Sequence, residues 1–295
     1  MPELPEVETV RLGLEPVLVG GTFSSVTTNR ADLRFPFPPN FSRRLRGARV
    51  MELERRAKYL IAHLSTGEAL VMHLGMTGRF HVHRAGAARA QLLGEYENLV
   101  PADDKHLHAL FEMAGGAKVA YFDPRRFGYM LLIPETELPD HALMRGLGVE
   151  PLTEALNAAY LASRAAGRKS DLKAFLLDQR IVAGLGNIYV CEALFRAGLK
   201  PSRRASILAG RGGRPTEHAV RLVAEIKAVL AEAVAAGGST LRDYRHADGA
   251  SGSFQSAFQV YGREGEPCVR PGCRGTVQRS IQGGRSSFYC PVCQR

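Results

Sequence analysis

The residues of this 295-residue chain that are best suited to chemistry are its first six, Met-Pro-Glu-Leu-Pro-Glu. If Met1 is removed, which a small second residue permits, the chain starts at Pro2 with a secondary amine. An α-amino group has a pKa of about 7.7–8.0, against about 10.4 for a lysine side chain, so far more of it is neutral at neutral pH. A neutral amine attacks carbonyl-like carbons and forms Schiff bases. The pattern predicts a nucleophilic N-terminus.

Two carboxylates accompany that amine. Glu3 and Glu6 lie one helical turn apart, so both can face the same side as Pro2. One could act as a general acid and the other as an orienting group. The same residues also suit an ordinary helix start, in which acidic side chains complement the helix dipole. These six residues alone leave both interpretations open.

Four of the five cysteines lie near the end of the chain and indicate a metal site. The spacing Cys268-x4-Cys273-x16-Cys290-x2-Cys293 supplies two close pairs of thiolates, as a tetrahedral structural zinc requires. Between the pairs, two strand-like segments flank Gln-Gly-Gly-Arg, which predicts a β-hairpin with Arg285 at its tip. An arginine at such a tip could enter a groove or grip a phosphate. The fifth cysteine lies in an apolar helical stretch and is interpreted as core.

Two loops carry side chains suited to a base stack. Met76 stands in Gly-Met-Thr-Gly, while Arg125 and Phe127 stand in Asp-Pro-Arg-Arg-Phe-Gly. A flexible apolar side chain and an aromatic ring, both near arginine, are typical of residues that insert between bases. The alternative is that Met76 and Phe127 fold back into the core. Lys58 stands in an apolar-flanked strand, where it either contacts a phosphate or snorkels to the surface.

A helical corner near residues 171–198 suggests an anion site. Two helical stripes are joined by Gly-Leu-Gly, and Asn187 is placed as the N-cap of the second helix. Backbone N–H groups at a helix start can face a phosphate. A helical hairpin with glycines is also a common structural connector. Residues 246–252 form a candidate loop that folds over a substrate, or an ordinary surface connector.

Two H-x-H pairs, His81/His83 and His106/His108, lie on expected strands. Because no carboxylate or thiol stands at ligand spacing beside them, we interpret them as solvent-facing strand histidines. Residues 84–104 carry alanine, glycine and mixed charges and are expected to form a surface excursion.

The elements that must position these residues indicate an α+β protein. An amphipathic helix over residues 4–18 precedes six short strands, at 50–53, 59–64, 69–74, 107–113, 118–122 and 127–132. With no helices of 10–15 residues between them, an antiparallel two-sheet sandwich is expected. We divide the chain into a sandwich domain with its leading helix (1–134), a linker (135–150), a helical domain (151–262) and a hairpin finger (263–295).

Composition favours a polyanionic partner. Lysine and arginine number 39 against 29 aspartates and glutamates, a net charge of +10. Arginine, the dominant cation, pairs with phosphate through a planar fork. An acidic membrane surface fits less well because no amphipathic helix has a dedicated basic face. Neither a secretory signal nor an apolar run long enough to span a bilayer is seen, so a cytosolic protein is expected.

Taken together, these blocks resemble bacterial formamidopyrimidine-DNA glycosylase. They include the first six residues, Arg-Ala-Lys-Tyr at 56–59, His-Leu-Gly-Met at 73–76, the two loops, Gly-Leu-Gly-Asn-Ile-Tyr at 184–189 and the four-cysteine finger. The resemblance implies a monomeric bacterial enzyme of base excision repair, associated with the nucleoid. It would remove oxidised purines such as 8-oxoguanine and formamidopyrimidines from duplex DNA and then cut the strand by β,δ-elimination.

The same resemblance assigns roles to single residues. Pro2 would be the nucleophile and Glu3 the acid/base, with Glu6 supporting the reaction centre. The phosphates around an extruded nucleotide would be held by Lys58, Asn187 and Arg285. The void and the orphaned base would be met by Met76, Arg125 and Phe127. A loop near 247–255 would cap the extruded base. Two features depart from the family pattern, namely the four-residue spacing of the first cysteine pair and the length of residues 84–104.

Three other functions compete with this one. The nearest is the sister endonuclease VIII-like activity on oxidised pyrimidines, against which Leu4 and the full Met76, Arg125 and Phe127 set argue. A non-catalytic lesion-binding protein would keep the corner and finger, but the intact Pro2-Glu3 pair argues against it. A zinc-hairpin RNA-binding protein is the third alternative.

Overall fold

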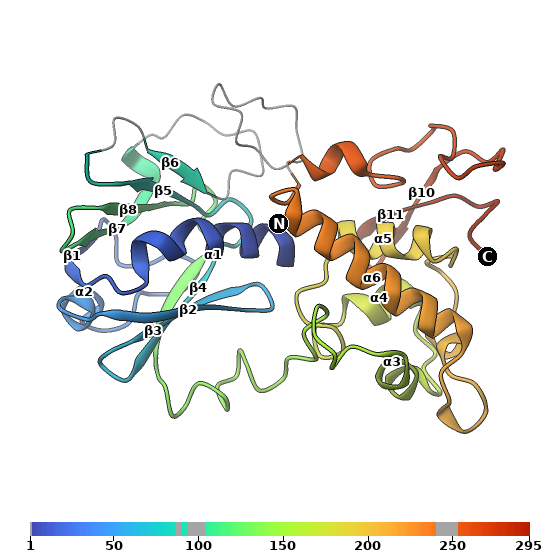
Figure 1. Ribbon diagram of the computed structural model, residues 1–295, viewed down its shortest axis with the longest axis horizontal. Coiled ribbons are helices and arrows are strands. Elements are labelled where there is room, and N and C mark those ends of the chain that lie inside the picture. Colours follow the sequence, from blue (N-terminus) through green and yellow to red (C-terminus); the bar gives the residue numbers. More distant parts are fainter. Residues whose placement is uncertain (1, 87–89, 94–103, 240–252) are drawn as a thin grey trace. The chain divides into compact units, whose positions relative to one another are not determined.

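The computed structural model describes residues 2–86, 90–93, 104–239 and 253–295. By their internal contacts these form two compact units, 1–145 with 237–253 and 146–236 with 254–295 (Figure 1). The four domain ranges expected from the sequence remain predictions. Residues 84–104 and the candidate capping loop at 246–252 fall wholly or largely outside the described residues.

The first unit begins with helix α1 (Leu4–Leu18), as the apolar spacing predicts. Pro5 is tolerated because it stands in the first turn, where backbone N–H groups have no helical partner anyway. One stripe of the helix, Val7, Val10, Leu14 and Leu18, is buried in the main core of the unit. The helix ends before Gly20, whose φ of +78° suits glycine. Burial of this stripe ties the chain start to the core.

Two antiparallel sheets make up the rest of the described first unit. One has the order β1-β7-β8-β5-β6 and the other the order β2-β3-β4-β9. The first comprises β1 (Phe23–Thr28), β7 (Leu107–Met113), β8 (Lys118–Phe122), β5 (Arg79–His83) and β6 (Gln91–Leu93). The second comprises β2 (Val50–Arg56), β3 (Tyr59–Leu64), β4 (Glu68–His73) and β9 (Tyr129–Pro134). A short helix, α2 (Phe41–Leu45), lies between β1 and β2 in the chain.

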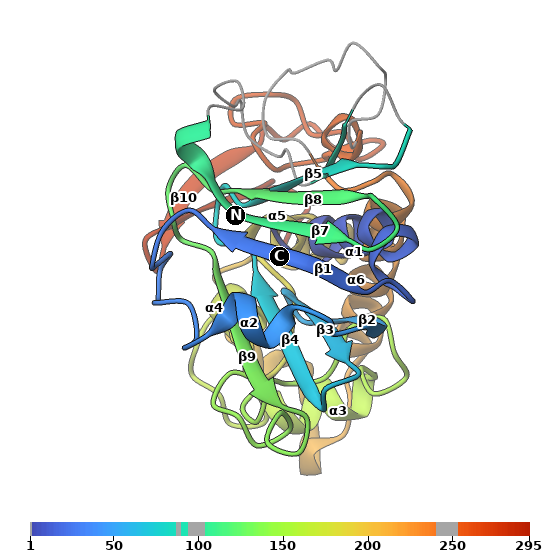
Figure 2. The same cartoon turned by 90° about the vertical axis from the view of Figure 1, so that its left-hand side faces the viewer.

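The sheets face each other across one apolar core, so the predicted sandwich is confirmed. Figure 2 shows the sheet of β1, β7, β8 and β5 above that of β2, β3, β4 and β9, with strands running in different directions. The outer face of the second sheet has its own apolar cluster. There, Ile61, Val71 and Ile133 pack against Leu138. The segment expected to be a linker, 135–150, therefore includes residues that cover this sheet.

The second unit holds the later α-helices, α3 to α6, and the hairpin. Its described helices are α3 (Ala158–Ala165), α4 (Leu172–Leu177), α5 (Asn187–Arg196) and α6 (Glu217–Ala235), which share one core. The predicted hairpin is present as β10 (Gln278–Gln282) paired with β11 (Arg285–Tyr289). Cys191 of α5 is fully buried between this helix and the cysteine-bearing segment, as expected of a core residue. No helix in the described part of the chain is long and apolar enough to cross a membrane.

Candidate active site and metal centre

Pro2 and Glu3 are buried at the start of α1, and the Glu6 side chain holds the Glu3 backbone. The carboxylate of Glu6 accepts a hydrogen bond from the N–H of Glu3 through Oε2 at 2.9 Å. Its Oε1 accepts from the N–H of Ser239 at 2.8 Å and from the Ser239 hydroxyl at 2.9 Å. Most chain ends fray unless they are tied down. The hydrogen bonds of Glu6 give this terminus a fixed geometry.

Lys58 lies in the two-residue turn between β2 and β3 rather than inside a strand as expected, and it is 8% exposed. The turn residue Ala57 has a φ of +54°, in the left-handed region. Lys58 acts on nearby His73: burial, with the positive charges of Lys58 and Arg34, lowers the pKa of this imidazole to about 4. The His73 ring is therefore neutral at neutral pH, and its Nδ1 accepts the N–H of Gly75 at 3.0 Å. Lys58 and Arg34 both supply positive charge at this point of the unit.

The loops at residues 75–78 and 123–128 meet inside the first unit. A Cβ on Gly75 would lie 2.3 Å from the nitrogen of Gly128, so only glycine allows the two backbones to come this close. Met76 is partly exposed, Arg125 is exposed and Phe127 is 42% exposed. The Arg125 guanidinium lies 4.9 Å from the centre of the Phe127 ring. The alternative in which Phe127 folds into the core is thus wrong, and two of the predicted site residues lie together.

In the second unit, Asn187 and Arg285 belong to two elements that touch. The amide nitrogen of Asn187 donates to the carbonyl of Ser286, the residue after Arg285, at 3.0 Å. The expectation that Asn187 is an N-cap is wrong: Gly186 is the cap and Asn187 is the first helical residue. Its side chain reaches the hairpin rather than its own helix, because Ser286 offers a buried carbonyl within reach. The preceding turn is shaped by Gln179, which donates to the carbonyl of Leu185 and accepts from the N–H of Gly184, both at 2.8 Å.

Lys173 is a second contact to the hairpin, one that the sequence did not reveal. This α4 side chain is 1% exposed, and its ammonium donates to the Ser286 carbonyl at 2.7 Å and the Ser287 hydroxyl at 2.6 Å. A longer contact, 3.4 Å, reaches the carbonyl of Arg285. Burial lowers the pKa of Lys173. A lysine within an apolar helical stripe was the available signal. The Arg285 side chain itself is exposed at the tip of the hairpin.

Four cysteine sulfurs form a metal-binding cluster. The Sγ atoms of Cys268, Cys273, Cys290 and Cys293 all lie within 4.8 Å of one another. Cys268 and Cys293 are 3.7 Å apart at sulfur, as are Cys273 and Cys290. Tetrahedral zinc with Zn–S bonds of about 2.3 Å places its sulfurs about 3.8 Å apart. The donor set therefore fits a single structural ion, and its four thiolates leave no coordination position open for catalysis.

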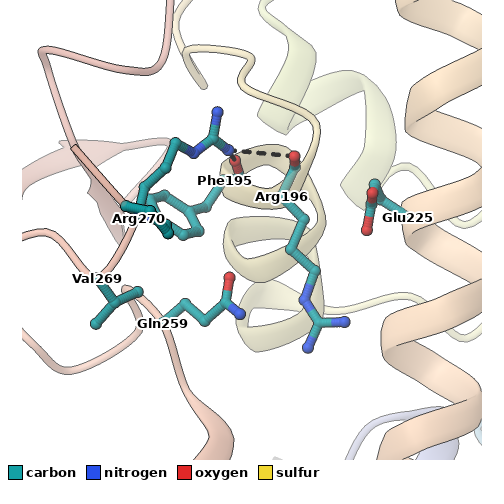
Figure 3. Close-up of a pocket in the computed structure, with 7 residues that line it drawn as sticks. Phe195, Arg196, Glu225, Gln259, Val269 and Arg270 are labelled. Atoms are coloured by element: carbon teal, nitrogen blue, oxygen red, sulfur yellow. Dashed lines mark hydrogen bonds between the residues drawn. The ribbon is translucent and has the colours of Figure 1, made fainter. Parts of the chain in front are cut away.

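The longer spacing between Cys268 and Cys273 has a structural consequence. It carries Arg270, whose guanidinium donates to the carbonyls of Phe195 at 2.6 Å and Arg196 at 3.2 Å, at the end of α5 (Figure 3). The same guanidinium lies 5.2 Å from the centre of the Phe195 ring. Carbonyls at a helix C-terminus have no helical partner and attract positive charge. The longer spacing thus connects the four-cysteine hairpin finger (the metal module, residues 263–295) to the end of α5. A shallow pocket of about 360 Å³ lies beside this contact and is also lined by Gln259 and Glu225.

Of the two histidine pairs, His83 is exposed as expected and His106 is half-buried, but the other two histidines are buried. His81 is 8% exposed and its ring lies against Phe122, with centroids 4.4 Å apart. His108 is 2% exposed, and its Nε2 donates to the carbonyl of Asp123 at 2.8 Å. The expectation is therefore wrong for these two, because aromatic and backbone partners inside the sheet replace water. Within the residues that the structure describes, the cysteines are the one group with metal-ligand geometry.

These features define a class: an antiparallel sandwich with a buried amino-terminal helix start, a helical corner and a four-cysteine hairpin. Comparison with known proteins identifies a family within this class. The model of the formamidopyrimidine-DNA glycosylase N-terminal domain matches residues 1–130, and that of the H2TH domain of the same enzymes matches residues 147–245. The formamidopyrimidine-DNA glycosylase of Chelativorans sp. (strain BNC1) is 55% identical over 299 residues, covering 100% of both chains.

Solved structures agree. The MutM (Fpg) protein of Thermus thermophilus is 40% identical with a TM-score of 0.79, covering 99% of this chain and 98% of its own. A Lactococcus lactis Fpg mutant, solved with DNA containing Fapy-dG, is 31% identical with a TM-score of 0.83 over the whole of both chains. The same bacterium's Fpg, solved with DNA containing an abasic site, has a TM-score of 0.81 at 31% identity over 99% of each chain. The chain belongs to the formamidopyrimidine-DNA glycosylase family and is a DNA glycosylase.

Proposed function

We propose that this protein is a bifunctional glycosylase and abasic-site lyase that removes oxidised purines, such as 8-oxoguanine and formamidopyrimidines, from duplex DNA in bacterial base excision repair. The observation that supports it best is the buried start of α1, where Glu6 holds the backbone of Glu3 beside Pro2. A nucleophile needs a fixed position to react efficiently, and the first residues of a chain rarely have one. The Lactococcus lactis relative bound to Fapy-dG DNA supports this substrate class.

The chemistry starts at the Pro2 nitrogen once Met1 has been removed. The nitrogen forms a bond to C1′ of the damaged nucleotide while the bond from C1′ to the base breaks. The base leaves with that electron pair and takes up a proton. The amine then loses its proton, the sugar ring oxygen gains one from Glu3, and the ring opens to a Schiff base.

Strand cleavage follows from the Schiff base by two eliminations. Loss of a proton from C2′ expels the 3′ phosphate, and loss of a proton from C4′ expels the 5′ phosphate. Hydrolysis then frees the amine from the sugar fragment. Glu3 is the acid/base in these steps, and Lys58 stabilises the negative charge of a leaving phosphate.

Base extrusion is required because C1′ and the base are hidden in the stack. Met76 and Phe127 fill the space that the extruded nucleotide leaves, and Arg125 meets the orphaned base, where a guanidinium favours the carbonyl of cytosine. Asn187 and Arg285 hold the neighbouring phosphates. The amide of Asn187 has a second N–H besides the one given to Ser286. The protein acts as a monomer on the bacterial nucleoid.

The metal in this proposal is one structural zinc ion held by Cys268, Cys273, Cys290 and Cys293. Four thiolates in two close pairs are the usual ligand set of structural zinc. The ion closes the hairpin on which Arg285 stands. Its role is to fix that hairpin, so it takes no part in bond breaking.

Borohydride trapping tests the proposal. A duplex with one 8-oxoguanine opposite cytosine is incubated with the protein and reductant, and mass spectrometry locates the adduct. We expect a covalent bond at an N-terminal Pro2, lost in Pro2→Gly and retained in Arg270→Ala. Cleavage with the adduct on Lys58 would keep the enzyme class but overturn the nucleophile. Neither adduct nor cleavage, with Met1 absent and zinc bound, would indicate a non-catalytic lesion-binding protein.

The sister specificity is tested with the same assay. Thymine glycol replaces 8-oxoguanine in an otherwise identical duplex, and single-turnover cleavage rates are compared. Faster cutting of 8-oxoguanine supports the purine enzyme. Faster cutting of thymine glycol would assign the protein to oxidised pyrimidines instead.

A further inference from the structure

We infer that Asp123 and Thr77 are positioning residues that join the two loops at 75–78 and 123–128 into one rigid unit. This inference rests on the proposed function, in which Met76, Arg125 and Phe127 occupy the opened stack. Asp123 is 0% and Thr77 7% exposed, so neither side chain is presented at the surface where DNA would bind. They act by fixing where the three exposed side chains stand relative to one another.

Asp123 is the buried centre of the second loop. It is 0% exposed, and its carboxylate accepts the N–H of Gly128 at 2.8 Å and the Thr77 hydroxyl at 2.5 Å. Its backbone N–H donates to the carbonyl of His106 at 3.1 Å, and its carbonyl accepts from His108 at 2.8 Å. A carboxylate in such a place is kept only if its oxygens are hydrogen-bonded. Asp123 therefore closes the turn from both ends.

Thr77 carries the connection from one loop to the other. Its hydroxyl donates to Asp123 and accepts the backbone N–H of Arg125 at 3.2 Å. It is 7% exposed and directly follows Met76. The residue beside the proposed wedge thus holds both the base of the second loop and the backbone of Arg125. A shift of either loop breaks at least one of these two bonds.

Two close contacts, at Gly75 and Gly128, restrict movement of the two loops relative to each other. Gly75 lies against the backbone of Phe127 and Gly128, where a Cβ would come within 2.3–2.8 Å of three main-chain atoms. On the other side, a Cβ on Gly128 would lie 2.0 Å from the Tyr121 hydroxyl and 2.7 Å from the His73 carbonyl. Side chains at either glycine would push the loops apart. The hydrogen bonds of Asp123 and Thr77 act across this close backbone contact.

Rigidity has a use in the proposed reaction. Separating stacked bases costs a few kcal/mol for each step, and the inserted side chains must recover it. If the loops became ordered only on binding, the loss of their conformational entropy would offset part of the free energy gained by inserting the side chains. Because the two loops are held together, Met76 and Arg125 also enter the DNA in one event. The Thr77–Asp123 connection (the joint) should therefore affect insertion and the choice of opposite base rather than bond breaking.

The experiment compares Thr77→Val with Thr77→Ser in the full-length protein with its metal bound. Valine keeps the shape and removes the hydroxyl, whereas serine keeps the hydroxyl. For 8-oxoguanine opposite cytosine we expect Thr77→Val to lower kcat/KM about tenfold, the effect of losing one or two buried hydrogen bonds. Thr77→Ser should stay within about twofold. Preference for cytosine over adenine opposite should shrink only in Thr77→Val, and cleavage of single-stranded abasic DNA serves as the internal reference.

A double-mutant cycle gives the readout that a general loss of stability would not produce. Met76→Ala and Arg125→Ala are made singly and together, first with Thr77 present and then in the Thr77→Val background. With Thr77 present, the combined loss should differ at least about threefold from the product of the single losses, as coupled neighbours do. In the Thr77→Val background the losses should multiply. Asp123→Asn, which places an NH2 donor against one of the two donors, Thr77 or Gly128, should behave like Thr77→Val.

Two results bear on different claims. If Met76→Ala and Arg125→Ala impair cleavage while Thr77→Val leaves the opposite-base preference and the coupling unchanged, the joint is refuted and the proposed function stands. If the unmodified protein neither cleaves nor forms the covalent adduct, the proposed function is refuted, and the inference that rests on it is refuted as well. Should Asp123→Asn fail to fold, Thr77→Val decides alone, because it removes a single hydroxyl.

Discussion

Glu3 and Glu6 stand one helical turn apart, and the hydrogen bonds of Glu6 bear on the different roles proposed for them. Both oxygens of Glu6 accept hydrogen bonds, from Glu3 on one side and from Ser239 on the other. A buried carboxylate occupied in this way holds geometry, since giving it a proton would replace acceptors with a donor. This supports assigning proton transfer to Glu3 and positioning to Glu6. The residue types alone left that choice open.

The neutral state of His73 leads to a pH prediction. Its pKa is about 4 because of burial and then of Lys58 and Arg34, against 6.5 when unfolded. Since the folded value is depressed, the stabilisation is complete above pH 6.5. It is lost as the pH falls towards 4, because the unfolded chain takes up the proton first. The difference corresponds to roughly 3 kcal/mol of unfolding free energy. Urea unfolding between pH 7 and pH 4 measures it.

His73→Asn is the matched control. Asparagine offers an oxygen near the position of Nδ1, so it can still accept the N–H of Gly75, but it does not titrate. We expect the fall in stability between pH 6.5 and pH 4 to be smaller in this variant by about the same 3 kcal/mol. An unchanged pH profile would mean that another group causes the loss.

At the scale of elements, Arg270 links the metal module to helix α5. Arg270→Ala removes two hydrogen bonds to the last carbonyls of the helix and the contact with the Phe195 ring. We expect a loss of about 1–3 kcal/mol in the unfolding free energy of the protein, the range for hydrogen bonds to a charged donor. Metal release to a chelator should also be faster. Thermal unfolding and a colorimetric zinc assay measure the two effects.

Val269→Ala provides the comparison for that variant. Val269 is the neighbouring residue between the same two cysteines and is 44% exposed. Its truncation removes little buried surface, so stability and metal release should stay close to those of the unmodified protein. Equal losses in both variants would show that any change between Cys268 and Cys273 disturbs the site, and that the cap on α5 has no special role.

The elements themselves were largely predictable, whereas their polar connections were not. Apolar spacing predicted α1 and six of the strands, because a buried face imposes its period on the sequence. Asn187 was wrongly assigned as a cap because its partner, the Ser286 carbonyl, lies 99 residues away in the chain. Lys173 and Asp123 were missed for the same reason. Each meets groups whose proximity exists only after folding. The one local signal, a lysine within the apolar stripe of α4, does not reveal which groups it contacts.

At the scale of the whole molecule, the excess of basic residues attracts a polyanion such as DNA. The chain carries a net charge of +10, and Arg285 stands exposed on a hairpin tip with no ion pair among the described residues. Some of the other basic side chains are paired with a carboxylate. Lys118, for example, lies 2.8 Å from Glu112 at the end of β8 away from the loop of Asp123. Charges of equal sign should therefore contribute unequally to DNA binding.

Salt dependence measures this difference. The logarithm of the binding constant should fall linearly with the logarithm of salt concentration, by about 0.9 for each phosphate that a Lys or Arg neutralises on duplex DNA. With the proposed phosphate contacts of Lys58, Arg285 and further arginines, we expect a slope of about −3 or steeper. Fluorescence anisotropy with a duplex carrying an uncleavable abasic analogue, between low and physiological salt, gives the value.

Arg285→Gln and Lys118→Gln separate a local contact from the overall field. Both variants lower the net charge by one, so a diffuse field would change binding equally in each. If Arg285 holds a phosphate, its variant alone should have a slope shallower by about 0.9, with weaker binding at every salt concentration. Lys118→Gln should match the unmodified protein, because Glu112 already neutralises that charge. Equal slopes in the two variants would assign the attraction to net charge and remove Arg285 from the phosphate contacts.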